Sequence, residues 1–185
     1  KPYRQHGSWQ RVFGSTTDSQ LIRRAPVPTL LTSRKSVVAG KPIVAALDMR
    51  DSKKTMSGLN EAIVNASRFL AGLLGSEVHY LFAYEAPTPI PSTVGATAYD
   101  FASNGRQELH DYSSELKENY GIASEAIVFE EGYPPDVIAA YGERVNAGAI
   151  VLGTLGRTGL HRLLVGNTAE KVQERTVSDL LILQN

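Results

Sequence analysis

The feature that most constrains the fold is the regular alternation of short apolar runs and helical patterns over residues 42–185. The first run, Pro42–Asp48, is continuous and apolar, which is typical of a strand buried on both faces. Strands that alternate with helices form parallel sheets with right-handed crossovers. The predicted strands are Pro42–Asp48, Glu77–Tyr84, Ile122–Phe129, Ala149–Leu152 and Leu180–Leu183.

The helical patterns between these strands have recognisable ends. The helix that includes Leu59 and Leu74 is expected to stop at Gly75, because glycine favours the left-handed conformation that ends helices. The helix predicted over Pro134–Asn146 has proline in its first turn, where no N–H is needed. Residues 96–120 have a helical but polar pattern.

Five parallel strands of this kind predict a three-layer α/β/α sandwich with the strand order 3-2-1-4-5. In that order the strand order reverses between the first and fourth strands. Ligands bind at the carboxyl ends of the strands at such a point. Asp48 ends the first strand and Gly153 follows the fourth. We therefore expect Asp48 and Gly153 to meet at a ligand crevice.

The strongest local signal is the glycine-rich segment from Gly153 to Thr168. Glycine lets backbone amides approach a ligand closely, and amides at a helix N-terminus attract phosphate oxygens. The spacing fits neither the Walker A loop nor the Gly-x-Gly-x-x-Gly fingerprint of dinucleotide enzymes. The segment is therefore either a phosphate-binding loop or a tight strand-to-helix connection. Arg157 either pairs with phosphate or belongs to the solvated face of the loop.

The spacing Gly153-x2-Gly156-x9-Gly166 resembles the Gly-x2-Gly-x9-Gly-Ser/Thr loop of nucleotide-binding universal stress proteins. The run Ile43–Asp48 looks like their first strand, and Gly132–Ile138 resembles their Gly-x-Pro-x-x-x-Ile stretch. The matches keep the family's order from residue 42 to residue 183. The chain is identified as a member of this family, most similar to the second repeat of its tandem, E-like members.

The resemblance implies an adenine nucleotide alpha hydrolase-like fold that binds ATP or AMP, with or without Mg²⁺. It assigns Asp48 to the ribose or adenine side, Ala83 to the flank of the base, and the loop amides to the phosphates. Asn167 departs from the family's Ser/Thr but remains a competent donor and helix cap. The positions that match the family's site are Ala46, Leu47, Asp48, Ala83, Leu152, Gly153, Leu155, Gly156, Arg157, Gly159, Gly166, Asn167 and Thr168.

The resemblance implies a non-enzymatic stress-response sensor or regulatory module. It contains no Walker lysine, evident general base, Ser-His-Asp arrangement or paired carboxylates, so no catalytic residues and no metal ligands are predicted. Slow ATP hydrolysis stays open. The alternative is a protein of the same fold that binds a different, partly apolar ligand or none, and acts as an interaction scaffold.

Two similar segments, Val12–Leu31 and Val165–Gln184, indicate an internal repeat. Each runs from a glycine through a small polar pair and an amphipathic helix to a short apolar strand. We therefore expect residues 1–33 to be the tail of a first, incomplete repeat, residues 34–41 to be a linker, and residues 42–185 to be a complete domain.

The last strands of the two repeats, at residues 28–33 and 180–185, are each expected at the edge of a sheet. Unpaired edges invite pairing because their backbone donors and acceptors lack partners. We predict that the two segments lie against each other, within one chain or across a homodimer. A disordered remnant is the alternative, because a segment below roughly 40 residues rarely builds its own core.

Composition narrows the class of partner. Lys+Arg and Asp+Glu are both 19, so there is no basic excess that would attract nucleic acid or an anionic membrane. The chain has no cysteine, no apolar run of membrane-spanning length and no signal-peptide pattern at its start. These features predict a cytoplasmic protein that binds neither nucleic acid nor a membrane. The partners expected from the crevice and the edge strands are a small ligand and another repeat or copy.

Overall fold

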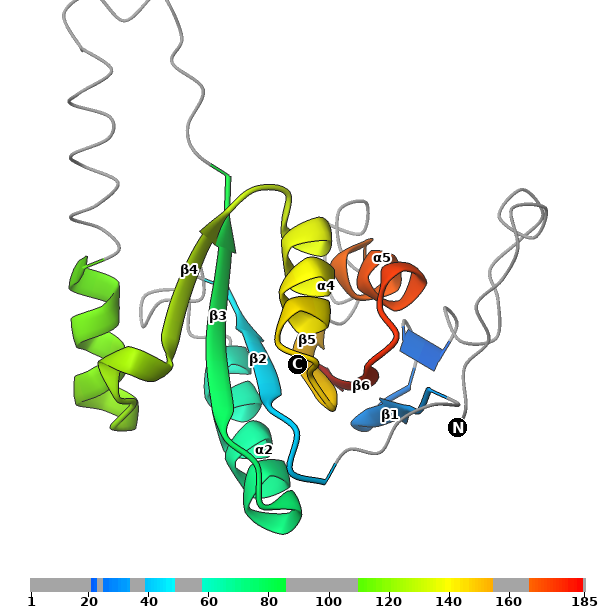
Figure 1. Cartoon of the computed structure of the whole chain (residues 1–185), viewed down its shortest axis with the longest axis horizontal. Helices are drawn as coiled ribbons and strands as arrows, with labels where there is room; N and C mark the ends of the chain where they lie inside the picture. The colour runs from blue at the N-terminus through cyan, green and yellow to red at the C-terminus, as the bar shows by residue number, and fades with distance from the viewer. Residues whose placement is uncertain are drawn as a thin grey trace, which may run out of the picture.

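The computed structural model describes residues 21–22, 25–33, 39–48, 58–85, 110–154 and 167–184. Six strands occur in this part of the chain: β1 (Thr29–Leu31), β2 (Ile43–Leu47), β3 (Val78–Tyr84), β4 (Ile127–Glu131), β5 (Ala149–Thr154) and β6 (Asp179–Gln184). They form one sheet in the order β1-β6-β5-β2-β3-β4 (Figure 1).

The sheet has six strands rather than the five predicted. The parallel strands take the order β4-β3-β2-β5-β6, which is the predicted 3-2-1-4-5 arrangement. The additional strand is β1, which pairs antiparallel with β6 and places Leu30 opposite Leu181. It joins the sheet because the outer edge of β6 would otherwise lack backbone partners. The predicted contact between residues 28–33 and 180–185 is confirmed within one chain.

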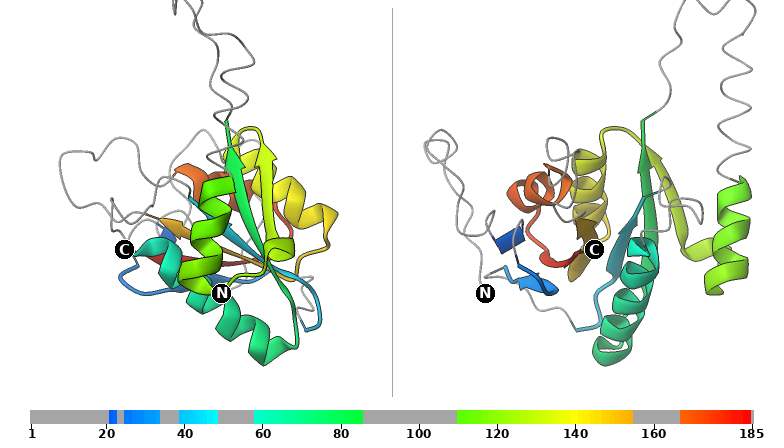
Figure 2. Two further views of the ribbon diagram at one scale, coloured as in Figure 1. Left: turned by 90° about the vertical axis from the view of Figure 1, so that its left-hand side faces the viewer. Right: turned by 180° about the vertical axis from the view of Figure 1, so that it is seen from behind.

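Helices cover both faces of the sheet, as predicted. α2 (Leu59–Leu74) and the helical residues 110–120 lie on one face. α4 (Pro134–Arg144) and α5 (Asn167–Arg175) lie on the other, as the right-hand view in Figure 2 shows. The fold is therefore a sandwich of three layers.

Each face of the sheet has its own hydrophobic core, and the alternating side chains of β2 enter both. Ile43, Ala45 and Leu47 pack in the core that contains residues of α2. Val44 and Ala46 pack in the core that contains residues of α4 and α5. All five residues of β2 are buried, which confirms a central strand covered on both sides.

The predicted helix ends agree with the structure to within a few residues. α2 is followed by Gly75, whose φ of 62° is left-handed and whose N–H donates to the Ala71 carbonyl. α4 begins with Pro134 as predicted but ends at Arg144, before the predicted end at Asn146. Of the predicted helix over residues 96–120, residues 110–120 are helical, and residues 96–109 lie outside the described residues.

The predicted strand Ile122–Phe129 starts too early. The 3₁₀ turn η1 (Ser124–Ala126) precedes β4, and the Ala126 N–H donates to the Ala123 carbonyl at 3.0 Å. Ile122 misled the prediction because it is buried, at 2% exposure, in the core that contains residues of α2 although it lies outside the strand.

The segment that carries β1 is attached to both ends of β6. The Ser33 N–H donates to Asp179 Oδ1 at 2.6 Å. At the other end, Gln184 Nε2 donates to the Ile22 carbonyl at 3.0 Å. Ile22 and Leu31 are fully buried in the core that contains residues of α4 and α5. Where it is described, this segment is therefore part of the fold and not a disordered remnant.

Candidate functional site

The reversal in strand order lies between β2 and β5. These strands are parallel neighbours, and Ala46 is paired with Leu152 near their carboxyl ends. From β2 the chain passes to α2 on one face of the sheet, and from β5 it passes to α5 on the other (Figure 1). Parallel α/β folds bind ligands where the connections from two neighbouring strands lead to opposite faces of the sheet. We call the end of the sheet marked by Asp48 and Gly153 the β2/β5 edge.

Asp48 directly follows β2 and is exposed, whereas the strand before it is buried. Asn60 of α2 pairs with both backbone groups of Asp48. The Asp48 N–H donates to Asn60 Oδ1 at 3.0 Å, and Asn60 Nδ2 donates to the Asp48 carbonyl at 2.7 Å. Asn60 is only 3% exposed, so water competes little for these bonds. The Asp48 carboxylate is therefore carried on a fixed backbone.

Tyr112, on the helical residues 110–120, adds a second attachment to Asp48. Its hydroxyl donates to the Asp48 carbonyl at 3.2 Å and accepts from Asn60 Nδ2 at 3.1 Å. The Tyr112 ring meets Phe82 of β3 edge to face, with 5.1 Å between the ring centroids. Side chains from α2 and from the helical residues 110–120 thus both bind the backbone of Asp48, the residue that follows β2 at the β2/β5 edge.

Gly153, on the other side of this edge, has a clear packing role. A Cβ atom at this position would lie 2.5, 2.6 and 2.8 Å from three side-chain atoms of Leu59, the first residue of α2. The absence of a side chain therefore lets α2 begin close against β5. For Gly153 itself, this observation favours a role in a tight strand-to-helix connection over a role in phosphate binding.

The strand residues that were predicted to belong to the ligand site lie in both hydrophobic cores. Ala46, Leu152 and Ala83 pack on the face covered by α4 and α5, with Ala83 only partly buried. Leu47 is buried in the opposite core, beneath α2. The first three therefore share one face of the sheet, next to the β2/β5 edge.

Most of the predicted phosphate loop lies outside the described residues, namely Leu155, Gly156, Arg157, Gly159 and Gly166. α5 begins at Asn167, as predicted, and Thr168 in its first turn is exposed. The α5 N-terminus follows β5 in the chain, so the order strand, glycine-rich segment, helix is present. Phosphate contacts by this segment stay a prediction.

The turn into α4 is built on Gly132. Its φ of 141° and the 2.9 Å that would separate a Cβ from Val137 Cγ2 explain why glycine stands there. The Gly132 N–H donates to the Tyr84 carbonyl at 2.8 Å, which ties the turn to the carboxyl end of β3. The next residue, Tyr133, accepts a hydrogen bond from the Lys171 ammonium of α5, which also lies over its ring.

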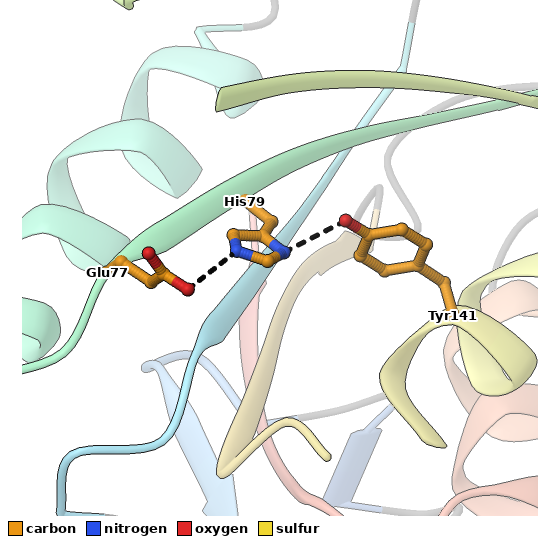
Figure 3. A network of polar contacts seen from close by, with 3 residues as sticks. All are labelled: Glu77, His79 and Tyr141. Carbon is orange, nitrogen blue, oxygen red and sulfur yellow. Dashed lines mark hydrogen bonds and ion pairs between the residues drawn. The ribbon is translucent and has the colours of Figure 1, made fainter. Parts of the chain in front are cut away.

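A polar network links β3 to α4 away from the β2/β5 edge (Figure 3). His79 Nδ1 lies 2.9 Å from the Tyr141 hydroxyl, and His79 Nε2 lies 3.1 Å from Glu77 Oε1. Burial raises the pKa of the Tyr141 hydroxyl, so this group keeps its proton beside the His79 ring. This geometry gives His79 a structural role between β3 and α4.

Sequence reasoning missed Asn60. The one available signal is that a polar residue occupies the buried stripe of α2, alongside Ile63, Val64 and Ala71. A buried polar side chain needs partners, but the helical pattern does not reveal that the partner is the backbone of Asp48.

In the part of the chain that the structure describes, no helix is long and apolar enough to cross a membrane. Within the same residues, no group of three or more His, Asp or Glu side chains could hold a metal ion.

Comparison with known proteins identifies the family. The profile of the universal stress protein family matches residues 40–184. Universal stress protein E of Escherichia coli is 31% identical in an alignment that covers 97% of this chain and 58% of that protein. The universal stress protein E homolog of Haemophilus influenzae is 29% identical in an alignment that covers 89% of this chain and 54% of that protein.

A solved structure has a fold similar to that of this chain. A functionally unknown protein from Pseudomonas aeruginosa superposes with a TM-score of 0.79 at 26% identity, covering 100% of this chain and 61% of its own. The chain thus spans less than two thirds of the length of each of these three relatives. Since the family profile matches most of its residues, the chain belongs to the universal stress protein family.

Proposed function

We propose that this chain binds an adenine nucleotide, ATP or AMP, at the β2/β5 edge and acts as a non-enzymatic stress-response module. The observation that carries the proposal is the exposed Asp48 carboxylate, held on a fixed backbone where the strand order reverses. A ligand with hydroxyl or amino donors and an anionic tail matches this carboxylate together with the N-terminus of α5.

Each part of the nucleotide has a proposed partner. The Asp48 carboxylate accepts from the ribose hydroxyls or the adenine amino group. The side chains of Ala46 and Ala83, which lie on the face covered by α4 and α5, flank the base. Backbone amides of the glycine-rich segment and of Asn167 and Thr168 hold the phosphates. Any Mg²⁺ would be carried in by the phosphates.

We also propose that residues 1–33 are the tail of a first repeat, followed by a linker at 34–41 and a complete domain at 42–185. When Val12–Leu31 is aligned with Val165–Gln184, Thr29 is equivalent to Ile182. These two residues are direct partners in the antiparallel β1–β6 pair. Pairing of equivalent residues is typical of a two-fold related contact, which supports two repeats meeting through their last strands.

Native mass spectrometry of the purified chain, followed by calorimetric titration with ATP and AMP, tests the nucleotide proposal. We expect a bound adenine nucleotide or saturable binding at about micromolar strength, near −8 kcal/mol. Asp48→Asn is expected to weaken binding, whereas Asp111→Asn, which changes an exposed carboxylate on residues 110–120, is the matched control. No binding of either nucleotide by the wild-type chain would overturn the proposal.

A second candidate is an interaction scaffold that binds a different, partly apolar ligand or none. Phe69 and Leu73 favour it, because they lie one turn apart on the outer side of α2 and are 70% and 67% exposed. Co-purification of a non-nucleotide ligand in the same mass spectrum would favour this candidate over the first.

A further inference from the structure

We infer that Asn60 is the positioning residue of the proposed site, and that it holds the Asp48 carboxylate in its ligand-binding direction with the help of Tyr112. The inference rests on the proposed function, because it concerns the same nucleotide. Its basis is the pairing of one buried side-chain amide with both backbone groups of an exposed acidic residue.

The chemistry of an asparagine side chain suits this task. Its amide presents one acceptor and two donor hydrogens in a plane, so a single side chain can pair with both the N–H and the carbonyl of one residue. Asn60 uses the acceptor and one hydrogen on Asp48, and directs Nδ2 to the Tyr112 hydroxyl as well. A leucine would leave the Asp48 N–H and carbonyl without these bonds, and an aspartate would lack the donor for the carbonyl.

The position of Asn60 makes this clamp rigid. It is the second residue of α2, a helix whose Ile63, Val64 and Ala71 are buried against the sheet. Tyr112 approaches from a separate helical segment, and its ring packs edge to face with Phe82. The backbone of Asp48 is therefore fixed from two sides at the residue where β2 ends.

A fixed backbone matters for binding because a ligand loses affinity when it must order a residue that it contacts. Without the clamp, the polypeptide after β2 can rotate, and the Asp48 carboxylate then points toward the ligand for only part of the time. The apparent affinity falls by that fraction. The strand itself, buried along all five residues, would remain in place.

The test compares Asn60→Ala and Tyr112→Phe with wild type, by titration of ATP into the folded chain. We expect an affinity loss of about tenfold for Asn60→Ala and about threefold for Tyr112→Phe, which keeps the ring against Phe82. Asn65→Ala changes an exposed asparagine on the same helix and is the matched control, with unchanged affinity.

A double-mutant cycle with Asp48→Asn separates positioning from a general structural effect. If Asn60 acts through the Asp48 carboxylate, Asn60→Ala is expected to cause little further loss once Asp48 is Asn. Equal losses in both backgrounds would overturn the inference, as would unchanged ATP affinity in both clamp variants. A wild-type chain that bound no ATP would instead overturn the proposed function, and the positioning role with it.

Hydrogen exchange at the Asp48 amide gives a readout that needs no ligand. We expect faster exchange of this amide in Asn60→Ala, with the amides of β3 unchanged. Protection equal to wild type would contradict the clamp even if the nucleotide proposal held.

Discussion

Gly153→Ala is expected to destabilise the protein, although alanine is ordinarily the smallest possible change at a glycine. The new Cβ would lie 2.5 to 2.8 Å from three atoms of the Leu59 side chain, against 3.4–4 Å for ordinary contact. Relief therefore requires Leu59 or the start of α2 to move by about 1 Å. Overpacking of this kind costs about 1–3 kcal/mol of unfolding free energy. For a chain of this length, each 1 kcal/mol lowers the Tm by roughly 2–4 °C.

Gly72→Ala is the matched comparison, and its effect should have the opposite sign. Gly72 lies inside α2, is exposed, and has nothing within 4 Å of the position a Cβ would take. Alanine there is expected to stabilise the protein by about 0.5–1 kcal/mol, because glycine is a poor helix former.

Urea denaturation of both variants, together with Leu59→Ala and the double variant Gly153→Ala/Leu59→Ala, measures these effects. The truncated Leu59 leaves space for the new methyl group, so the double variant should recover about 1 kcal/mol or more relative to additivity. Additive effects of the two substitutions, or a neutral Gly153→Ala, would refute the packing role assigned to Gly153.

Three further predictions concern other parts of the molecule. Gly166→Val should weaken ATP binding by blocking backbone approach to the phosphates, and equal calorimetric affinities would refute the loop assignment. Asp179→Ala removes the acceptor for the Ser33 N–H, so hydrogen exchange in β1 should become faster, whereas unchanged protection would show that this bond does not hold the strand. Tyr141 has a pKa raised above 10.0 by burial, so its contribution to stability is present below pH 10.0 and is lost as the pH rises through the folded pKa. Stability measured at alkaline pH should fall less steeply in Tyr141→Phe, and an unchanged slope would contradict this.

The order and layers of the sheet could be predicted from sequence because they depend on local patterns. The continuous apolar run at Ile43–Leu47 and the helical stripe of α2 each report burial directly. The position of Asp48 at the carboxyl edge of the sheet follows from the strand order alone. The pairing of β1 with β6 was also predictable, because two similar edge segments need backbone partners.

Contacts between distant residues could not be predicted in this way. Asn60 and Tyr112 hold Asp48 through bonds to its backbone, and no periodic pattern encodes which peptide group a buried amide will reach. The role of Gly153 was ambiguous for a similar reason, since the clash that excludes a side chain involves Leu59, far away in the sequence. Ile122 shows the converse, because a buried residue outside the strand carries the same apolar signal as one inside it.

Chemical-shift mapping of the isotope-labelled chain with ATP tests the central claim most directly. We predict saturable shifts at the amides of Asp48, which follows β2, of Gly153 in β5 and of Thr168 in the first turn of α5. His79, in the network between β3 and α4, should stay unchanged. Saturable shifts confined to residues away from this edge, or none at millimolar ATP, would contradict the assignment of an adenine nucleotide site to the β2/β5 edge.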